Sequence, residues 1–417
     1  MRGPAVHPVA IVAGGTGGHF FPAEALASEL IARGQRIVLL CDARSAGLRS
    51  PVFAGHERFV IHGAGIAGRG VLRGATAIAA LARGVAQARG ILARLDVAAM
   101  VAFGGYPSVA PVLAARLLRR QHRVYDRAPV ILHEQNAVLG RANRFLARHA
   151  DLVALSFAAT EGVRIGTATI ATGNPVRPAI AALGEQAYAP PNSPQAGGTV
   201  RLLILGGSLG ARLFSDVVPE AVAALPPDLR ARLSIVQQCR PEDLDRVRAA
   251  YTRSSVAAEL GAFFPNVADR LAAAHLVISR AGASSVAELA VAGRPAILVP
   301  LANAIDDHQS ANARALVAAR GASAIAQHDL TPAMLAEQLA LLLEHPDMLA
   351  HAASAARGVA RADAAARLAD LVCSLMRQEA SAAKTSPSSN APASNAPASN
   401  APASNAPSSN GSSGRGP

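Results

Sequence analysis

The stretch IVAGGTGGHFFPAEAL (residues 11–26) joins an apolar run to a helical pattern through a turn of four glycines and a histidine. The apolar run over 9–13 is typical of a buried strand, and residues 23–34 have a helical pattern that ends at Gly34. A second apolar run over 36–41 completes a strand–helix–strand unit. Such a unit predicts a parallel sheet.

The same order of elements returns in the second half of the chain. It consists of a strand over 200–205, the turn GGSLGA over 206–211, a helix over 212–225 and a strand over 233–238. Residues 184–199, rich in Pro, Gly and Ser, separate the two units and are typical of a linker. The sequence therefore predicts an α/β protein with two doubly wound, Rossmann-like parallel-sheet domains in tandem.

Bulk composition limits the classes of protein that fit. The chain has 417 residues, 51% of them hydrophobic, which is enough for two cores. Its three cysteines have no paired spacing, which argues against a disulfide framework or a zinc site and fits a reducing cytosol. Residues 1–10 lack the apolar core of a secretion signal, and no charge-free apolar run is long enough to span a membrane. Residues 391–405 are three copies of APASN, so we expect a disordered tail beyond about residue 380.

The net charge of +12 is concentrated in the first part of the chain. Residues 1–180 hold 21 Arg and Lys against 9 Asp and Glu, whereas residues 181–417 hold 19 of each. This asymmetry indicates an anionic partner for the first part, which could be nucleic acid, an acidic ligand or an anionic membrane. An arginine-rich solvated surface explains the charge equally well.

The turn GGTGGH (14–19) has the chemistry of a phosphate site. Glycines let backbone N–H groups approach a phosphate, and the following helix N-terminus adds partial positive charge. The turn is not the dinucleotide fingerprint G-x-G-x-x-G, because position 20 is Phe20, and no G-K-[ST] of a Walker loop follows. His19 lies where ligands bind in open α/β sheets and suits a general base near neutral pH. The alternative is a tight turn with incidental glycines.

Further polar clusters in the first half follow apolar runs. Tyr106, in FGGYPS (103–108), can stack or hydrogen-bond to a ligand, or can simply face solvent. His133, Glu134, Gln135 and Asn136 follow a strand and suit a polyhydroxylated ligand, although Asn136 is also a good helix cap. Arg177, in a proline-bounded loop, can face an anion or remain solvated.

The second half repeats the phosphate-cradle chemistry at GGSLGAR (206–212), where Ser208 adds a hydroxyl. Ser285 and Glu288 have the S-x-x-E spacing of a capping box, whereas the functional interpretation gives Glu288 to the hydroxyls of a ribose. His308 and Gln309 can contact a sugar or merely begin a helix. A pair of glycine turns on facing domains suggests a nucleotide in the cleft between them.

Taken together and in this order, the motifs resemble the MurG family of bacterial UDP-N-acetylglucosamine transferases, which convert lipid I to lipid II in peptidoglycan synthesis. The resemblance spans about residues 8–375. The residues that carry it are GGTGGH (14–19), FGGYPS (103–108), LHEQNAVLGRANR (132–144), GNPVR (173–177), GGSLGAR (206–212), RAGASSVAEL (280–289) and DHQSANA (307–313). The sequence departs from the family's pattern at Leu209, at Ser215 and over 236–243, where the family has Gln, Asn and H-Q-[ST]-G.

This resemblance implies a GT-B fold with the active site between two domains. It assigns residues 1–183 to an acceptor domain that associates with the membrane, 184–199 to a linker and 200–353 to a UDP-GlcNAc domain. Helices over 354–380 then pack back on the first domain, and residues 381–417 form the tail. The basic first part would be attracted to the anionic cytoplasmic face of the inner membrane through residues 69–94, Arg116, Arg119, Arg120 and Arg123. Ile78, Leu81 and Val85 would add an apolar contact there, or be buried in the core.

The resemblance also implies roles for single residues in an inverting transfer. His19 would be the catalytic base, with Glu134 as the second catalytic residue. UDP-GlcNAc would contact Thr16, Gly17, Gly18, Asn136, Arg177, Gly207, Ser208, Phe264, Glu288, His308 and Gln309. The acceptor, undecaprenyl-linked lipid I, would contact Gly15, Gly105, Tyr106 and Asn136. No tightly bound cofactor, no metal site and no nucleic-acid partner are expected, while other cell-wall synthesis and division proteins are further candidate partners.

Three rival functions stay open at this point. One is a related GT-B transferase with another lipid acceptor such as diacylglycerol, against which the segment 132–144 argues. A nucleotide-binding oxidoreductase is disfavoured by the missing dinucleotide fingerprint. A non-catalytic nucleotide-sugar or nucleic-acid binder would release no UDP from UDP-GlcNAc in the presence of a lipid I analogue.

Overall fold

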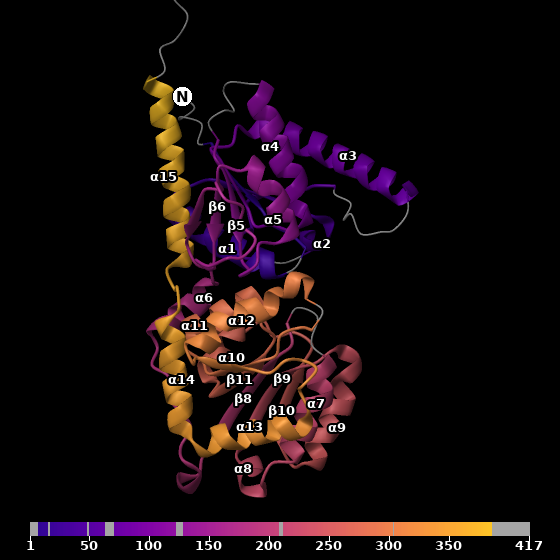
Figure 1. Cartoon of the computed structure of the whole chain (residues 1–417), viewed down its shortest axis with the longest axis vertical. Coiled ribbons are helices and arrows are strands. Elements are labelled where there is room, and N and C mark those ends of the chain that lie inside the picture. Colours follow the sequence, from indigo (N-terminus) through magenta and orange to yellow (C-terminus); the bar gives the residue numbers. More distant parts are fainter. Residues whose placement is uncertain are drawn as a thin grey trace, which may run out of the picture.

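The chain folds into two lobes that follow one another along its longest axis, as Figure 1 shows. The structure is a computed structural model, and it describes residues 7–15, 17–47, 50–62, 71–121, 128–207, 212–302 and 304–385. Each lobe is built on one parallel sheet, and the second sheet begins where the sequence predicts a second strand–helix–strand unit. Among the described helices, none is long and apolar enough to cross a bilayer.

The first lobe has a seven-stranded sheet with strand order β3-β2-β1-β4-β5-β6-β7. Its strands are β1 (Val9–Val12), β2 (Ile37–Cys41), β3 (Glu57–Val60), β4 (Ala99–Ala102), β5 (Val130–Glu134), β6 (Leu152–Leu155) and β7 (Thr169–Ala171). All pairs are parallel, and the order reverses between β1 and β4. Ligands of open α/β sheets bind at the carboxyl ends of strands beside such a reversal.

The helices of this lobe are α1 (Gly17–Ala32), α2 (Ala43–Ala46), α3 (Val71–Leu95), α4 (Val109–Gln121) and α5 (Arg141–Leu146). Helix α1 begins inside the glycine run, although its apolar pattern predicts a helix only from residue 23. Pro22 lies inside this helix and has no N–H, so it cannot donate to the carbonyl of Gly18 one turn earlier. That carbonyl instead accepts a hydrogen bond from Ser284 of the second lobe, at 3.3 Å.

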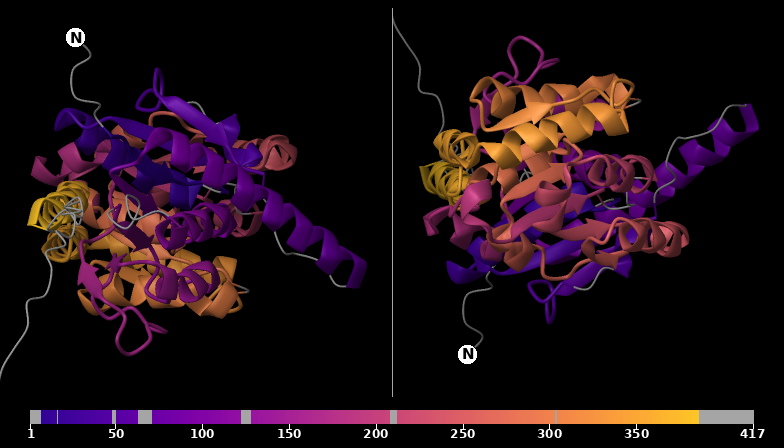
Figure 2. Two further views of the ribbon diagram at one scale, coloured as in Figure 1. Left: turned by 90° about the horizontal axis from the view of Figure 1, so that it is seen from above. Right: turned by 90° about the horizontal axis from the view of Figure 1, so that it is seen from below.

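Helix α3 extends away from the body of the first lobe, as the two views of Figure 2 show. Leu81 and Val85 pack against the core of this lobe, as the core alternative expects, whereas Ile78 is 69% exposed. Arg119, on α4, binds the carboxylate of Asp151 at 2.5 to 2.8 Å and is therefore already paired within the lobe. Arg123 and the side chain of Arg120 lie outside the described residues.

The second lobe has a six-stranded parallel sheet with strand order β10-β9-β8-β11-β12-β13. Its strands are β8 (Val200–Leu205), β9 (Leu233–Gln238), β10 (Ala257–Gly261), β11 (Leu276–Ser279), β12 (Ala296–Leu298) and β13 (Ala322–Ala324). Helices α7 (Arg212–Ala223), α8 (Pro227–Ala231), α9 (Leu244–Arg253), α10 (Val267–Ala273), α11 (Ala283–Ala292), α12 (His308–Ala318), α13 (Pro332–Glu344) and α14 (Pro346–Gly358) surround it.

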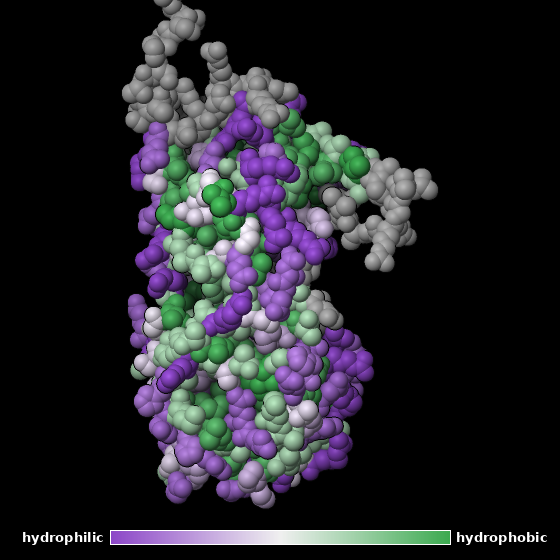
Figure 3. Space-filling view, viewed as in Figure 1, coloured by the Kyte–Doolittle hydropathy of each residue, from purple (hydrophilic) through white to green (hydrophobic). Residues whose placement is uncertain are grey.

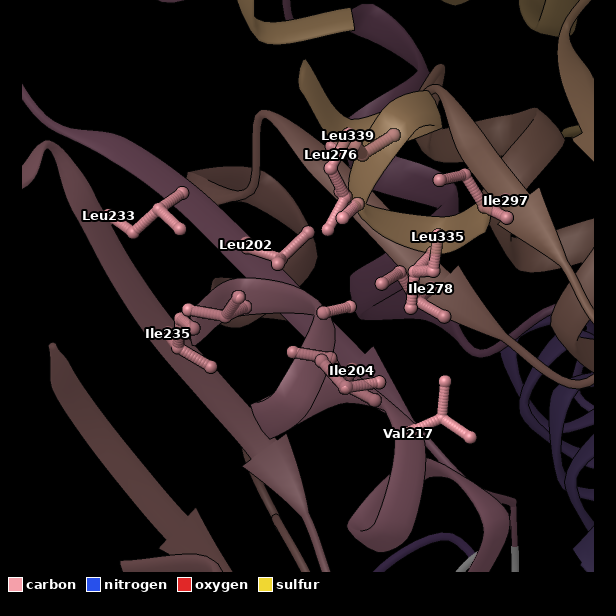
Figure 4. Close-up of a cluster of buried hydrophobic side chains, with 14 of the residues drawn as sticks. Leu202, Ile204, Val217, Leu233, Ile235, Leu276, Ile278, Ile297, Leu335 and Leu339 are labelled. Atoms are coloured by element: carbon pink, nitrogen blue, oxygen red, sulfur yellow. The ribbon is translucent and has the colours of Figure 1, made fainter. Parts of the chain in front are cut away.

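One apolar core of the second lobe lies between its sheet and several helices, among them α7 and α13. Leu202 and Ile204 alternate along β8 and point to the same face, because successive side chains of a strand point to opposite faces. Figure 4 shows them meeting Val217 of α7, together with Leu335 and Leu339 of α13. Burial of these branched side chains fixes the sheet that presents the second glycine turn.

The last helix, α15 (Ala364–Thr385), returns to the first lobe and runs alongside it in Figure 1. Leu368, Ala369 and Val372 are buried with residues of α1 in one apolar cluster. On the edge of this contact, Arg33 binds Asp370 at 2.6 Å. The sequence places the return at residue 354, but α14 still packs on α11 and α13, so the return begins after residue 358.

His133 is part of the sheet of the first lobe and not of the loop after it. The sequence places the end of the strand before His133, whereas β5 runs to Glu134 and turns the His133 ring into the interior. Its Nε2 donates to the carbonyl of Gly173 at 3.1 Å, and its Nδ1 accepts from the Gln135 amide at 3.0 Å. Burial lowers the pKa of His133 to about 4.

The buried ring makes stability depend on pH. In the unfolded chain a histidine takes up a proton near pH 6.5, but the folded ring resists protonation down to about pH 4. Lowering the pH from 7 to 5 should therefore reduce the free energy of unfolding by about 2 kcal/mol through His133. Urea denaturation of wild type and of His133→Gln, whose amide can still donate to Gly173, should show a weaker pH dependence in the variant. An exposed control, His328→Gln, should keep the wild-type dependence, and an equal dependence in His133→Gln would contradict the prediction.

Candidate active site

A cleft of about 1800 Å³ separates the two lobes and is lined by both of them. Figure 3 shows the indentation between the lobes on one face of the molecule. A pocket for one small ligand has a volume of about 300 to 1000 Å³, so the cleft has room for two substrates side by side. It brings together most of the residues that the sequence singles out, namely Gly17, Gly18, His19, Gly105, Tyr106, Glu134, Asn136, Arg177, Gly207, Phe264, Glu288, His308 and Gln309. Thr16, Ser208 and Leu209 lie outside the described residues.

His19 lies in the first turn of α1 and borders the cleft. Its ring passes close to Gly105, where a β-carbon would be 3.4 Å from the ring Cε1, and Gly105 has a φ of 69°. Among the described residues the His19 Nδ1 has no hydrogen-bond partner. Burial lowers the pKa of His19, while the charges of Glu134 and Asp42 oppose this effect. The ring is therefore neutral at pH 7 and chemically able to accept a proton.

The segment after β2 binds the backbone of the first glycine turn. The N–H of Gly15 donates to the carboxylate of Asp42 at 3.1 Å and to the hydroxyl of Ser45 at 2.8 Å. The sequence gives this N–H to the acceptor, but the protein itself already occupies it. The N-terminal turn of α1, at Gly17 and Gly18, is what remains for an anion, because helix N-termini carry N–H groups without partners in the helix.

The second glycine turn is held by Gln238 at the end of β9. Its side-chain oxygen accepts from the Gly206 N–H at 3.2 Å, and its amide donates to the carbonyl of Ala262 at 3.1 Å. Sequence reasoning missed this residue, because the stretch 236–243 looked only like a departure from the family. Ser215, another departure, is buried in α7 and does not line the cleft.

Glu134 organises the loop that follows β5. Its Oε1 accepts from the backbone and side-chain amides of Asn136, at 3.0 and 3.1 Å. Its Oε2 accepts from the Gly140 N–H and the Asn143 amide, both at 2.9 Å. Only 2% of Glu134 is exposed. A carboxylate with four donors is well placed to fix a loop, and less well placed to take a proton from a substrate.

The four polar residues expected together at this edge do not all face a ligand. His133 does not line the cleft. Gln135 borders it but is nearly buried and binds His133, and Glu134 and Asn136 also border it. The alternative of Asn136 as a helix cap is wrong, because α5 begins at Arg141 with Gly140 before it.

Arg177 and Glu288 pair with each other in the cleft. The guanidinium donates to both carboxylate oxygens, at 3.0 and 3.1 Å, and lies over the ring of Phe21 at 4.8 Å. Burial raises the pKa of Glu288, and the charge of Arg177 opposes this. The capping-box alternative is wrong, since α11 begins at Ala283 and Ser285 lies inside it. The sequence alone cannot reveal this pair, because its members lie 111 positions apart in the chain.

The far wall of the cleft is built from α12 and the loop after β10. His308 and Gln309 form the first turn of α12, and the Gln309 side-chain oxygen accepts from the Leu301 N–H at 3.0 Å. Phe264 is nearly buried, with its ring under the guanidinium of Arg270 at 4.1 Å. Its neighbour Phe263, which the sequence reasoning missed, borders the cleft and is 70% exposed. On the opposite wall Tyr106 is 51% exposed.

Within the described ranges, no three His, Cys, Asp or Glu side chains are grouped so that they could hold a metal ion. The polar groups of the site are of three kinds. These are a neutral histidine, two helix N-termini and an arginine–carboxylate pair.

Comparison with known proteins identifies this arrangement. The model of the glycosyltransferase family 28 N-terminal domain matches residues 9–155, and that of its C-terminal domain matches residues 201–368. A Granulibacter bethesdensis protein named UDP-N-acetylglucosamine–N-acetylmuramyl-(pentapeptide) pyrophosphoryl-undecaprenol N-acetylglucosamine transferase is 59% identical over 371 residues, 89% of this chain and 94% of the relative. The chain belongs to glycosyltransferase family 28, and within it to the MurG family.

Other members of the MurG family agree with this assignment. An Acidiphilium cryptum relative of the same name is 52% identical over 91% of this chain and 99% of its own. The crystal structure of MurG from Acinetobacter baumannii superposes with a TM-score of 0.67 at 30% identity, over 88% of this chain and 99% of that one. A UDP-GlcNAc 2-epimerase from Neisseria meningitidis bound to UDP-GlcNAc shares the fold at 13% identity and a TM-score of 0.60. The predicted family and the predicted GT-B fold are confirmed.

The four hydrogen bonds to Glu134 lead to a prediction for Glu134→Gln. Glutamine keeps the shape but turns one end into a donor that faces N–H groups, so buried donors lose their acceptor. The free energy of unfolding should fall by about 1 to 3 kcal/mol. Denaturant unfolding would measure it, with the exposed Glu161→Gln as control. If Glu134→Gln abolishes turnover at unchanged stability, Glu134 is the base and not the organiser of its loop.

Proposed function

We propose that this chain moves GlcNAc from UDP-GlcNAc to the MurNAc 4-hydroxyl of undecaprenyl-pyrophosphoryl-MurNAc-pentapeptide, the step from lipid I to lipid II in peptidoglycan synthesis. The names of its close relatives support the reaction, since the chain covers nearly their whole length. The observation that carries the proposal is the neutral His19 in a two-lobed cleft with room for two substrates.

The donor is placed on the second lobe. Its diphosphate would meet the second glycine turn, which Gln238 holds at Gly206. Glu288 would accept from the ribose hydroxyls while Arg177 orients its carboxylate. His308 and Gln309 would face the GlcNAc. Phe264 contributes through its place in the loop after β10, because its ring is covered.

The acceptor is placed on the first lobe. Its diphosphate would meet the N-terminal turn of α1, where Gly17 and Gly18, which the family resemblance assigns to UDP-GlcNAc, border the cleft. Gly105 and Tyr106 would line its path on one side, with Asn136 on the other. Gly15 contributes through the shape of the turn, because Asp42 and Ser45 occupy its N–H.

The transfer is a single displacement that inverts the anomeric carbon, because the donor is α-linked and the product of the family is β-linked. His19 takes the proton of the acceptor hydroxyl as that oxygen bonds to the sugar carbon and the bond to the UDP oxygen breaks. The leaving diphosphate gains negative charge, which fixed N–H groups and the helix N-terminus stabilise. No cofactor and no resident metal are part of this proposal.

We place the enzyme at the cytoplasmic face of the inner membrane as a peripheral protein. Helix α3 projects from the acceptor lobe and carries the exposed Ile78, Arg83 and Arg89. Basic residues near an anionic leaflet are attracted by about 1 kcal/mol each. The lipid-linked acceptor lies in that leaflet, and other cell-wall synthesis and division proteins are candidate partners there, whereas nucleic acid is not.

Transfer of labelled GlcNAc from UDP-GlcNAc to a lipid I analogue tests the function. Wild type should transfer, and His19→Ala should lower kcat by about 100-fold or more, since general bases contribute factors of this size. Because burial lowers the pKa of His19, the acid limb of kcat/KM should lie below pH 6.5. A wild type that binds UDP-GlcNAc but cannot use lipid I would overturn the function, and a near-normal His19→Ala would move the base elsewhere.

Co-sedimentation with vesicles tests the location. Binding should be strong for phosphatidylglycerol vesicles, weak for phosphatidylcholine vesicles, and reduced by salt. Replacing Arg83 and Arg89 together by Ala should weaken binding to anionic vesicles by about 30-fold. Replacing the two exposed residues Arg248 and Arg253 of the second lobe is the matched control. Binding that ignores both lipid charge and salt would argue against this location.

A further inference from the structure

Asn312 is a fully buried polar residue at the boundary between the lobes, and none of the roles above uses it. It lies on α12, about one turn after His308, and its exposed fraction is 0%. Its side-chain oxygen accepts from the N–H of Ala137 at 2.8 Å. Its amide donates to the Asn136 side-chain oxygen and to the Ala281 carbonyl, both at 3.2 Å.

These hydrogen bonds have a fixed direction, because they end on a carboxylate. Glu134 can only accept, so the amide nitrogen of Asn136 must point at it and the Asn136 oxygen must point away. That oxygen then needs a donor, and among the described residues the amide nitrogen of Asn312 supplies one. The Asn312 oxygen is thereby left for the Ala137 N–H. One arrangement of the two amides satisfies all groups, so the connection is specific.

The connection crosses from one lobe to the other. Asn136 and Ala137 belong to the loop between β5 and α5, whereas Asn312 and Ala281 belong to the second lobe. The ion pairs beside it that join α12 and the loop before it to the first lobe are longer or open to solvent. Arg314 binds Glu161 at 2.6 Å with both side chains more than half exposed, and Arg141 and Arg144 lie 3.6 Å from Asp306. Solvent screens exposed ion pairs and weakens them, whereas a buried polar group that loses its partner bears the full cost of its removal from water.

We propose that Asn312 is a positioning residue that fastens the loop 135–140 of the acceptor lobe to the donor lobe and so aligns the two halves of the cleft for transfer. The inference rests on the proposed function for its kinetic part. Asn312 acts through Asn136 and through the first turn of α12, which also carries His308 and Gln309. A donor sugar held by that turn and an acceptor held beside Asn136 are then kept in one geometry.

Loss of this alignment should lower turnover more than donor binding. UDP-GlcNAc is held mainly by the second lobe, which stays folded without the connection. The reacting atoms, however, are brought together by both lobes, and a misplacement of about 1 Å costs about 100-fold in rate. We therefore expect Asn312→Ala to lower kcat by at least about tenfold, while the Kd for UDP-GlcNAc changes by less than about threefold.

Hydrogen exchange on the enzyme alone reports the connection without any turnover. The Ala137 N–H donates to Asn312, so exchange in a peptide that covers residues 135–140 should be faster in Asn312→Ala. Asn312→Asp keeps this acceptor but loses both donated bonds, so Ala137 should stay protected while kcat falls as in Asn312→Ala. Arg314→Ala is the matched control on the same helix, because it removes an exposed contact across the same boundary. It should leave both kcat and this peptide close to wild type.

A double-mutant cycle tests whether Asn136 and Asn312 act together. If both act through one hydrogen bond, the combined change Asn136→Ala with Asn312→Ala should lower kcat by much less than the product of the single effects. Unchanged exchange at 135–140 in Asn312→Ala would overturn the connection, and so would a wild-type kcat. A loss of UDP-GlcNAc affinity as large as the loss of kcat would also overturn it. A wild type without any transfer activity would refute the proposed function instead, and faster exchange would still support the connection.

Discussion

The buried carboxylate of Glu134 at the carboxyl end of β5 is the constraint on which the cleft depends. An ionised group out of contact with water is stable only when donors surround it, and four N–H groups do so here. Meeting that need fixes Asn136, Gly140 and Asn143, and with them the loop that faces the second lobe. The orientation of Asn136 then decides how Asn312 can bind. The need of one buried carboxylate in the first lobe for hydrogen-bond donors thus also determines how the second lobe is held against the first.

In the rest of the site, backbone groups border the cleft and side chains hold the backbone in place. In each lobe a glycine turn at the end of the first strand leaves the backbone open to a ligand. A side chain from the neighbouring strand region then holds each turn. Asp42, with Ser45, does this after β2, and Gln238 does it at the end of β9. Pro22 has no N–H to donate to the Gly18 carbonyl. This carbonyl therefore remains available to Ser284 of the opposite lobe. The cleft is thus organised by hydrogen bonds that cross between elements far apart in the sequence.

Much of the fold is predictable because it rests on local patterns. The apolar runs over 9–13 and 200–205 form β1 and β8, and each glycine turn follows the carboxyl end of its strand. Helix starts were less predictable. Helix α1 begins at Gly17, and the Gly18 carbonyl in its first turn has a tertiary partner, Ser284, that no apolar pattern reveals. The end of β5 was misplaced for a related reason. His133 looks polar in sequence, but a buried acceptor at Gly173 and the amide of Gln135 make it a core residue.

The sequence by itself determined the two parallel sheets, the glycine turns, His19 at the edge of the first sheet and the family to which the chain belongs. These features depend on residue types and on short spacings along the chain, both of which can be recognised without knowledge of the fold. Only the tertiary structure decided which polar groups bind each other and which remain for substrates. It paired Arg177 with Glu288, gave the Gly15 N–H to Asp42 and Ser45, and buried Asn312 against Asn136. The physical reason is that a polar side chain forms hydrogen bonds with the groups that the folded chain brings close to it. These partners can lie hundreds of residues away in the sequence.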